Sequence, residues 1–234
     1  MVPGSHIPVA LWMTRGAHQT FPVLEVDGQR IGDSTAIIAA LEQRFPNSPL
    51  YPEDPDQRRR ALELEDYFDE ELGPAARLLP FHELGNDPEL LRQIIERTSP
   101  EALARRSGPA TVYARTYTAL RFRVRSEAGA EQARLTALSA LDRLEAELGD
   151  GEYLVGDSFT VADLTAASLF YPLFVPEGSP LPADTRLPAG LEDFREPLKE
   201  RRGFKWVSEM FRRHRRRDGR QADAPAPPAT AGAE

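Results

Sequence analysis

Cysteine is absent from this sequence of 234 residues. Disulfide bonds, thiolate metal ligands and cysteine nucleophiles are therefore excluded for this chain. Histidine is scarce as well, and its four copies stand far apart, at positions 6, 18, 82 and 214. A metal site in a helical protein needs histidines or carboxylates that converge from several helices. The sparse histidines therefore predict that no metal is bound.

Long apolar runs are also missing. No stretch reaches the roughly 18 apolar residues of a membrane-spanning helix, so no transmembrane segment is expected. The first residues show no basic stretch followed by an apolar core, which predicts a cytoplasmic protein without a signal peptide. The net charge of -8 disfavours general nucleic-acid binding, because the phosphate backbone repels an acidic surface. The basic cluster at residues 212–217 does not need nucleic-acid binding to explain it, because positive charges at the C-terminus of a helix are favourable in themselves.

What the sequence does contain is 41% hydrophobic residues, enough for a sizeable core. Residues 21–26 read FPVLEV, which is typical of a strand. Asp27 and Gly28 follow as a tight-turn dipeptide, and residues 29–32 form the return strand of the expected hairpin. A helix is predicted from residue 34 until the proline-rich stretch that begins at Pro46.

Strand signals fade after about residue 56, and amphipathic helical patterns follow. We therefore expect a small β-containing domain at residues 1–46 and a linker at 47–55. An all-helical domain is expected at 56–217. The last segment, residues 218–234, is rich in alanine and proline and is expected to be disordered.

Asp33 and Ser34 stand where the first helix after the hairpin is expected to begin. Both residue types are favoured helix N-caps, so capping alone accounts for their presence. The start of a helix also exposes unpaired backbone N–H groups and the positive end of the helix dipole. Such a position binds a carboxylate or a phosphate. From the residues alone, capping and ligand binding both remain open.

Thr160 and Asp163 have the spacing of a helix capping box. Phe159 and Leu164 occupy the flanking positions of a hydrophobic staple. This pattern accounts for Asp163 without a catalytic role, and it predicts a structural element rather than a site.

The motif from Phe21 through the hairpin to Asp33 and Ser34 resembles the glutathione S-transferase family. The Thr160–Asp163 pattern resembles the capping box of that family's helical domain. The resemblance spans roughly residues 6–217 and implies an α+β/α fold: a partial thioredoxin-like β-hairpin with helices, then a mostly α-helical C-terminal domain. It also implies that Pro22 is cis, that the backbone of Phe21 pairs with the cysteinyl part of glutathione, and that Asp33 and Ser34 hold the γ-glutamyl carboxylate.

The resemblance further implies a reaction and partners. Glutathione would be the co-substrate, its thiol would be joined to a small electrophile, and the protein would be a homodimer. Four aromatic residues are candidates for the pocket of the second substrate: Tyr67, Phe68, Tyr113 and Tyr117. Core packing is at least as good an interpretation of each. The carboxylates at positions 63, 65, 66, 69, 70 and 71 are interpreted as a solvated helix face.

The thiol-activating Tyr, Ser or Cys of the family has no counterpart in this sequence, so no catalytic residue is assigned. The family pattern begins abruptly near His6, which suggests that part of the thioredoxin-like domain is missing and that Met1 is an internal methionine of a longer protein. Two alternatives to an active transferase follow: a non-catalytic binding or interaction module, and a truncated, inactive product.

Overall fold

The computed structural model describes residues 22–47, 49–98, 126–179 and 186–215. It begins with an antiparallel hairpin of β1 (Val23–Val26) and β2 (Gln29–Gly32), in which Val23 pairs with Gly32. Asp27 and Gly28 form the turn with φ angles of 47° and 74°. Two successive positive φ angles are what a type I′ hairpin turn requires, so the Asp-Gly dipeptide acts as the sequence predicts.

Helix α2 (Ser34–Arg44) follows the hairpin directly, and Phe45, immediately before Pro46, is its C-cap. None of its residues is fully buried. Glu42 of α2 holds the chain that leads away from it, because its carboxylate accepts hydrogen bonds from the backbone N–H groups of Leu50 and Tyr51 at 3.0 Å. Residues 22–47 are called the hairpin segment below.

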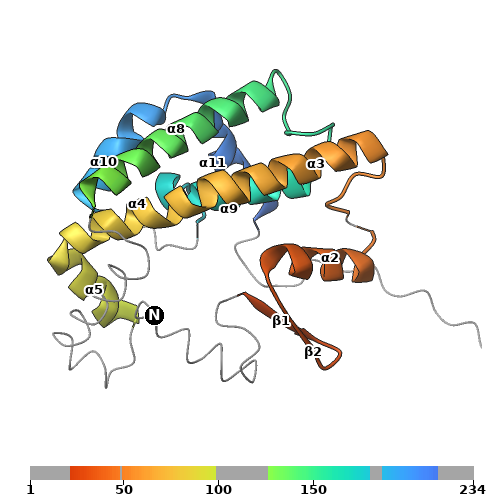
Figure 1. Cartoon of the computed structure of the whole chain (residues 1–234), viewed down its shortest axis with the longest axis horizontal. Coiled ribbons are helices and arrows are strands. Elements are labelled where there is room, and N and C mark those ends of the chain that lie inside the picture. Colours follow the sequence, from red (N-terminus) through yellow and green to blue (C-terminus); the bar gives the residue numbers. More distant parts are fainter. Residues whose placement is uncertain (1–21, 48, 99–125, 180–185, 216–234) are drawn as a thin grey trace, which may run out of the picture.

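The rest of the described chain is the helical body. Its elements are α3 (Pro55–Tyr67), the π-helical turn η1 (Phe68–Leu72), α4 (Gly73–Asn86), α5 (Pro88–Thr98), α8 (Glu127–Leu148), α9 (Val161–Phe174), α10 (Ala189–Arg195), the 3-10 turn η2 (Glu196–Leu198) and α11 (Arg202–His214). Figure 1 shows α3 and α4 as one long path, with α8 beside it. Helix α4 packs against both α8 and α9, and α11 packs against the same two helices.

The core of the helical body lies where α3, η1, α9 and α11 meet. Phe68 and Phe170 have no exposed surface, and their rings meet edge to face with centroids 6.3 Å apart. Phe170 stacks on Phe174 at 4.9 Å, and Phe174 contacts Phe204 of α11 at 4.6 Å. Aromatic side chains that are buried in this way contribute much of the stability of a core.

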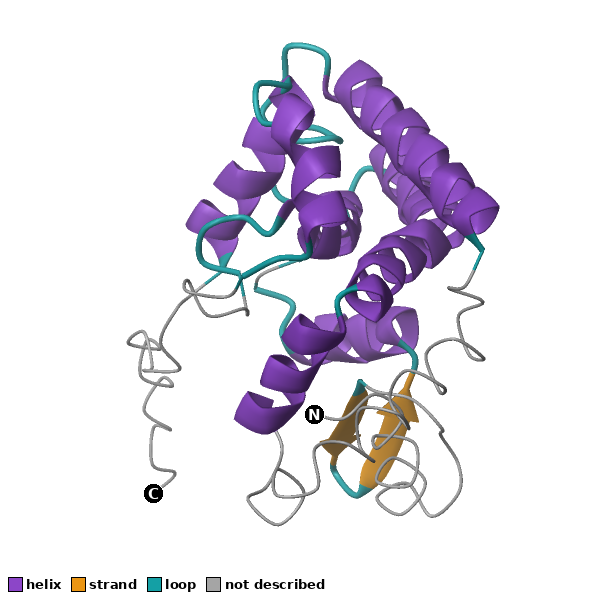
Figure 2. Ribbon diagram, turned by 90° about the vertical axis from the view of Figure 1, so that its left-hand side faces the viewer, coloured by secondary structure: helices purple, strands orange, loops and turns teal. Residues whose placement is uncertain are grey.

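The hairpin lies at one end of the molecule, with α2 between it and the helical body (Figures 1 and 2). Contact between the two parts is sparse and partly polar. Ile38 of α2 packs against the core as a half-buried residue. The hydroxyl of Thr35 donates a hydrogen bond of 3.0 Å to Oε1 of Glu65 in α3. The start of α2 is thereby fixed close to the last turns of α3.

Candidate functional site

The hairpin register places the predicted binding residues at one end of the sheet. Because Val23 pairs with Gly32, the residues next to them, Pro22 and Asp33, lie at the same end of the hairpin. Pro22 is exposed there. Phe21, the residue whose backbone is expected to contact a ligand, lies outside the described part of the chain.

Asp33 is the N-cap of α2, and its carboxylate accepts a hydrogen bond of 3.1 Å from the backbone N–H of Ala36. Its φ angle of 74° is uncommon for a residue with a Cβ atom, and such strain is often found at functional sites. Ser34 is the first helical residue and is exposed. The N–H groups of Ser34 and Thr35 have no acceptor within the helix, because they belong to its first turn. Capping therefore satisfies one N–H group and leaves others for a carboxylate or phosphate.

Glu65 is a buried carboxylate beside this helix start. Only 3% of the residue is exposed. Its Oε1 accepts the hydrogen bond from Thr35, while its Oε2 is buried and has no hydrogen-bond partner among the described residues. Burial raises the pKa of Glu65, and the negative charges of Asp66, Asp69 and Asp33 raise it further.

The burial of Glu65 corrects part of the interpretation of the acidic run. The acidic run was assigned to a solvated helix face, which holds for Glu63, Asp66 and Asp69 but not for Glu65. The spacing of the apolar residues around Glu65 could have indicated that it is buried. The buried positions of α3 and η1 are Ala61, Leu64, Glu65, Phe68 and Leu72. These follow the i, i+3, i+4, i+7 pattern of a buried helix face, and Glu65 stands in the middle of that apolar stripe.

Two of the four aromatic pocket candidates lie in the described chain. Tyr67 is half-buried, meets Phe68 edge to face at 5.2 Å, and has the guanidinium of Arg143 5.7 Å from its ring centroid. Burial raises the pKa of the Tyr67 hydroxyl, and the positive charge of Arg143 opposes that shift. Phe68 has no exposed surface, so it is a core residue here and not the wall of an open pocket. Tyr113 and Tyr117 lie outside the described residues.

Thr160 and Asp163 form a capping box at the start of α9. The fully buried carboxylate of Asp163 accepts hydrogen bonds of 2.8 Å from the backbone N–H of Thr160 and from that of Leu154. Burial raises the pKa of Asp163 and these hydrogen bonds oppose the rise. The arrangement closes the loop before α9, which is a structural role.

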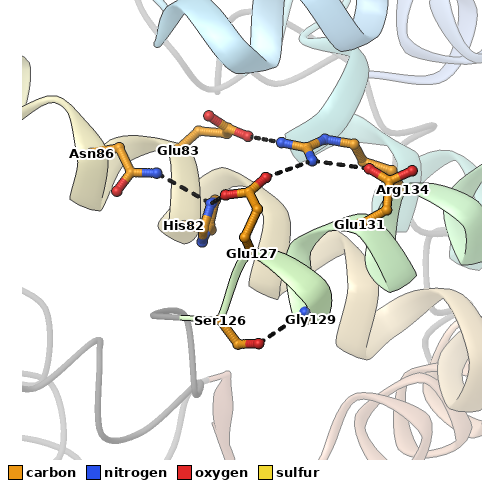
Figure 3. A network of polar contacts seen from close by, with 8 residues as sticks. All are labelled: His82, Glu83, Asn86, Ser126, Glu127, Gly129, Glu131 and Arg134. Carbon is orange, nitrogen blue, oxygen red and sulfur yellow. Dashed lines mark hydrogen bonds and ion pairs between the residues drawn. The ribbon is translucent and has the colours of Figure 1, made fainter.

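A polar network that the sequence patterns did not reveal joins the end of α4 to the start of α8 (Figure 3). Buried His82 contacts the carboxylate of Glu127 at 3.1 Å. Arg134 of α8 binds the carboxylates of Glu127 and Glu131, each at 3.2 Å, and also the buried Glu83 of α4. The charged groups of the network pair with one another and hold α8 against α4, so the network has a structural role.

Neither a metal site nor a membrane span is found in the part of the chain that the structure describes. No group of three or more histidine or carboxylate side chains there could hold a metal ion. None of the described helices combines the length and the apolar character needed to cross a membrane.

Comparison with known families tests the family resemblance that the hairpin motif suggests. Residues 1–49 match the model of the glutathione S-transferase N-terminal domain, and residues 112–198 match that of the glutathione S-transferase C-terminal domain. The chain belongs to the glutathione S-transferase family. The family inferred from the motifs is therefore confirmed. The fold class is confirmed as well, since a short two-stranded sheet precedes a helical body that carries the C-terminal domain match.

One curated relative and two solved structures are similar to this chain. A probable maleylacetoacetate isomerase from Caenorhabditis elegans is 29% identical over 174 residues, which are 74% of this chain; the chain spans 65% of that relative's length. A glutathione S-transferase from Methylobacterium radiotolerans, crystallised with glutathione sulfonate, is 24% identical with a TM-score of 0.46 over 86% of this chain and 75% of that one. The β-etherase LigF from Sphingobium sp. strain SYK-6 is 19% identical with a TM-score of 0.49 over 85% of this chain and 82% of that one.

Proposed function

We propose that this protein binds glutathione at the hairpin end of α2 and joins the glutathione sulfur to a small electrophile. The observation that carries the proposal is the register of the hairpin, which brings Pro22 and the start of α2 to one place. The γ-glutamyl carboxylate would accept hydrogen bonds from the free N–H groups at Ser34, where the helix dipole also favours a negative charge. The backbone of Phe21, next to Pro22, would pair with the cysteinyl part.

The proposed reaction is a displacement or an addition at carbon. The thiolate sulfur of glutathione forms a bond to the electrophilic carbon, and a leaving group departs with its electron pair or the electrons move onto the acceptor. The thiol proton is released to solvent before the attack. A hydrogen-bond donor near the sulfur would favour the thiolate by lowering the pKa of the thiol. That donor is not assigned to any residue.

The proposal includes the domain boundaries at residues 46 and 56, a homodimer, and a cytoplasmic location. The electrophile would bind against the helical domain, with Tyr67, Tyr113 and Tyr117 as candidates for its pocket. Half-buried Tyr67 is supported by its place two residues after Glu65, at the end of α3 that lies close to the start of α2.

Binding and turnover can be measured separately on the full chain. Calorimetry with glutathione should show saturable binding. Ser34→Ala keeps the backbone N–H but removes the side-chain hydroxyl as a second donor to the carboxylate, and it should weaken binding about fivefold, since a typical hydrogen bond contributes about 1 kcal/mol. Ser139→Ala, at an exposed position of α8, is the matched control and should leave the affinity unchanged. Turnover is then tested with an activated aryl halide and with maleylacetoacetate, the compound in the name of the curated relative.

A non-catalytic binding module is the second candidate, because the motif analysis assigns no residue to the thiol-activating position. Retention on immobilised glutathione without turnover of any electrophile would favour that candidate. Absence of both binding and turnover would contradict the proposal and favour an inactive product.

A further inference from the structure

A pocket of about 200 Å³ lies between α9 and α11. Its α9 wall contains Leu164, Ala167 and Ser168, which share one face of the helix because of their spacing. Since Ala167 and Ser168 are small, space remains between this wall and α11. Met210 and Phe211 line the pocket from α11. None of the lining residues belongs to α2 or α3, so the pocket is separate from the proposed glutathione site.

Two flat rings, those of Phe159 and His214, also line this pocket. The imidazole of His214 stacks on Phe159 with the ring centroids 4.0 Å apart and the planes inclined by 19°. The Nε2 atom of His214 contacts the hydroxyl of Tyr153 at 3.2 Å, which holds the imidazole in place. Burial lowers the pKa of His214, so the imidazole is neutral at neutral pH. Walls of aliphatic and uncharged ring groups favour an apolar ring as the body of a ligand.

Arg215, an exposed residue directly after the end of α11, adds a positive charge to the lining. Its guanidinium donates a hydrogen bond to the backbone carbonyl of Gly178. Among the described residues, no carboxylate forms an ion pair with Arg215. Its neighbours on α11 differ, because Arg212 and Arg213 both pair with Glu209. A guanidinium has five N–H donors in a planar fork, so Arg215 keeps donors that suit a carboxylate.

A small molecule with one aromatic ring and a carboxylate satisfies both the walls and the charge of this pocket. A cavity of roughly 150 Å³ takes up benzene, so this pocket has room for one six-membered ring with a short side chain. We propose that the pocket between α9 and α11 is a second ligand site, that it takes a single-ring aromatic carboxylate, and that the carboxylate pairs with Arg215. This site is independent of the proposed glutathione site.

Calorimetry on the full chain tests the charge preference with two probes of the same shape. Phenylacetate carries the carboxylate, and phenylacetamide replaces it with a neutral amide. Wild type should bind phenylacetate saturably and about fivefold more tightly than phenylacetamide, the upper range for an ion pair at an exposed position. Arg215→Gln should lose most of that preference. Arg212→Gln removes an exposed cation of the same helix that does not line the pocket, and it should keep the preference.

The location of the site is tested by filling the pocket from an exposed position. Ser168→Phe places a ring in the space next to α11 and should weaken phenylacetate binding at least tenfold. Ser139→Phe makes the same change at an exposed position of α8 and should leave the affinity unchanged. Circular dichroism verifies that both variants are folded.

Three results would overturn the second site. They are no phenylacetate binding by wild type, equal affinity for phenylacetate in Ser168→Phe and Ser139→Phe, and equal preference for the carboxylate in wild type and Arg215→Gln. Each of them would leave the proposed glutathione site untouched, because glutathione binding is measured separately.

Discussion

The helical body and the hairpin segment of this protein are held together by different kinds of interaction. The helical body has a continuous apolar core in which Phe68, Phe170 and Leu144 have no exposed surface. In the hairpin segment no side chain of α2 is fully buried, and its links to the rest include the carboxylate of Glu42 and the hydroxyl of Thr35. The proposed binding residues lie on the weakly anchored part. The comparison indicates that the body supplies the stability, while the segment's polar anchors set the geometry of the site.

The largest effect is expected from breaking the core. Phe68→Ala should reduce the free energy of unfolding by about 3–5 kcal/mol, because it removes a fully buried aromatic side chain and leaves a cavity. Phe45→Ala, at a position that is 63% exposed at the end of α2, should change it by less than about 0.5 kcal/mol. Urea unfolding followed by circular dichroism measures both. Equal losses in the two variants would contradict the difference between the two regions.

The next largest effect is expected in the network of Figure 3. Arg134→Met should cost about 3 kcal/mol, because Glu83, which is only 7% exposed, would keep its charge without a cation. Adding Glu83→Gln to that variant should recover much of the loss. Arg59→Met breaks an exposed pair with Asp56 and is the control, with an expected change below about 1 kcal/mol.

A smaller, local effect is expected from Glu42→Ala. The substitution removes the acceptor for the N–H groups of Leu50 and Tyr51, which should loosen the hairpin segment by about 1–2 kcal/mol. Hydrogen exchange should become faster at residues 22–47 and stay unchanged in α8 and α9, and glutathione affinity should fall. Glu25→Ala, whose carboxylate pairs only with exposed Arg30 among the described residues, is the control. Faster exchange throughout the helical body would show that the two regions are not separable.

The smallest effect concerns the pH dependence of stability. Because the folded state raises the pKa of Glu65, the native protein keeps this proton over a pH range in which the unfolded chain has lost it. Stability from this group is therefore lost as pH rises from the usual glutamate pKa through the raised one. Glu65→Gln should remove that slope and raise the melting temperature slightly at neutral pH, while Glu63→Gln should not. A lower melting temperature for Glu65→Gln at neutral pH would contradict this account.

The sequence predicted the turn and the helix starts of this structure because these features depend on a few neighbouring residues. The Asp27-Gly28 turn needs two positive φ angles, and α2 begins where Asp33 can cap it. The long α8 (Glu127–Leu148) fits the amphipathic helical patterns expected after residue 56, and its first turn is capped by Ser126. In each case a few neighbouring residues determine the outcome.

Features that depend on contacts between distant segments were missed. Assigning charged residues to the surface places Glu65 in solvent. Its burial instead follows from the packing of α3 against α9 and from its hydrogen bond with Thr35, which is thirty positions away in the sequence. The pairing of Glu83 with Arg134 joins two helices that no local pattern relates. The site residues Phe21, Tyr113 and Tyr117 lie outside the described residues, so their roles stay predictions.

A crystal structure of the full chain with bound glutathione tests the central claim most directly. The account predicts the γ-glutamyl carboxylate within hydrogen-bond distance of the backbone N–H of Ser34. Glutathione bound away from the start of α2 would contradict the proposed site.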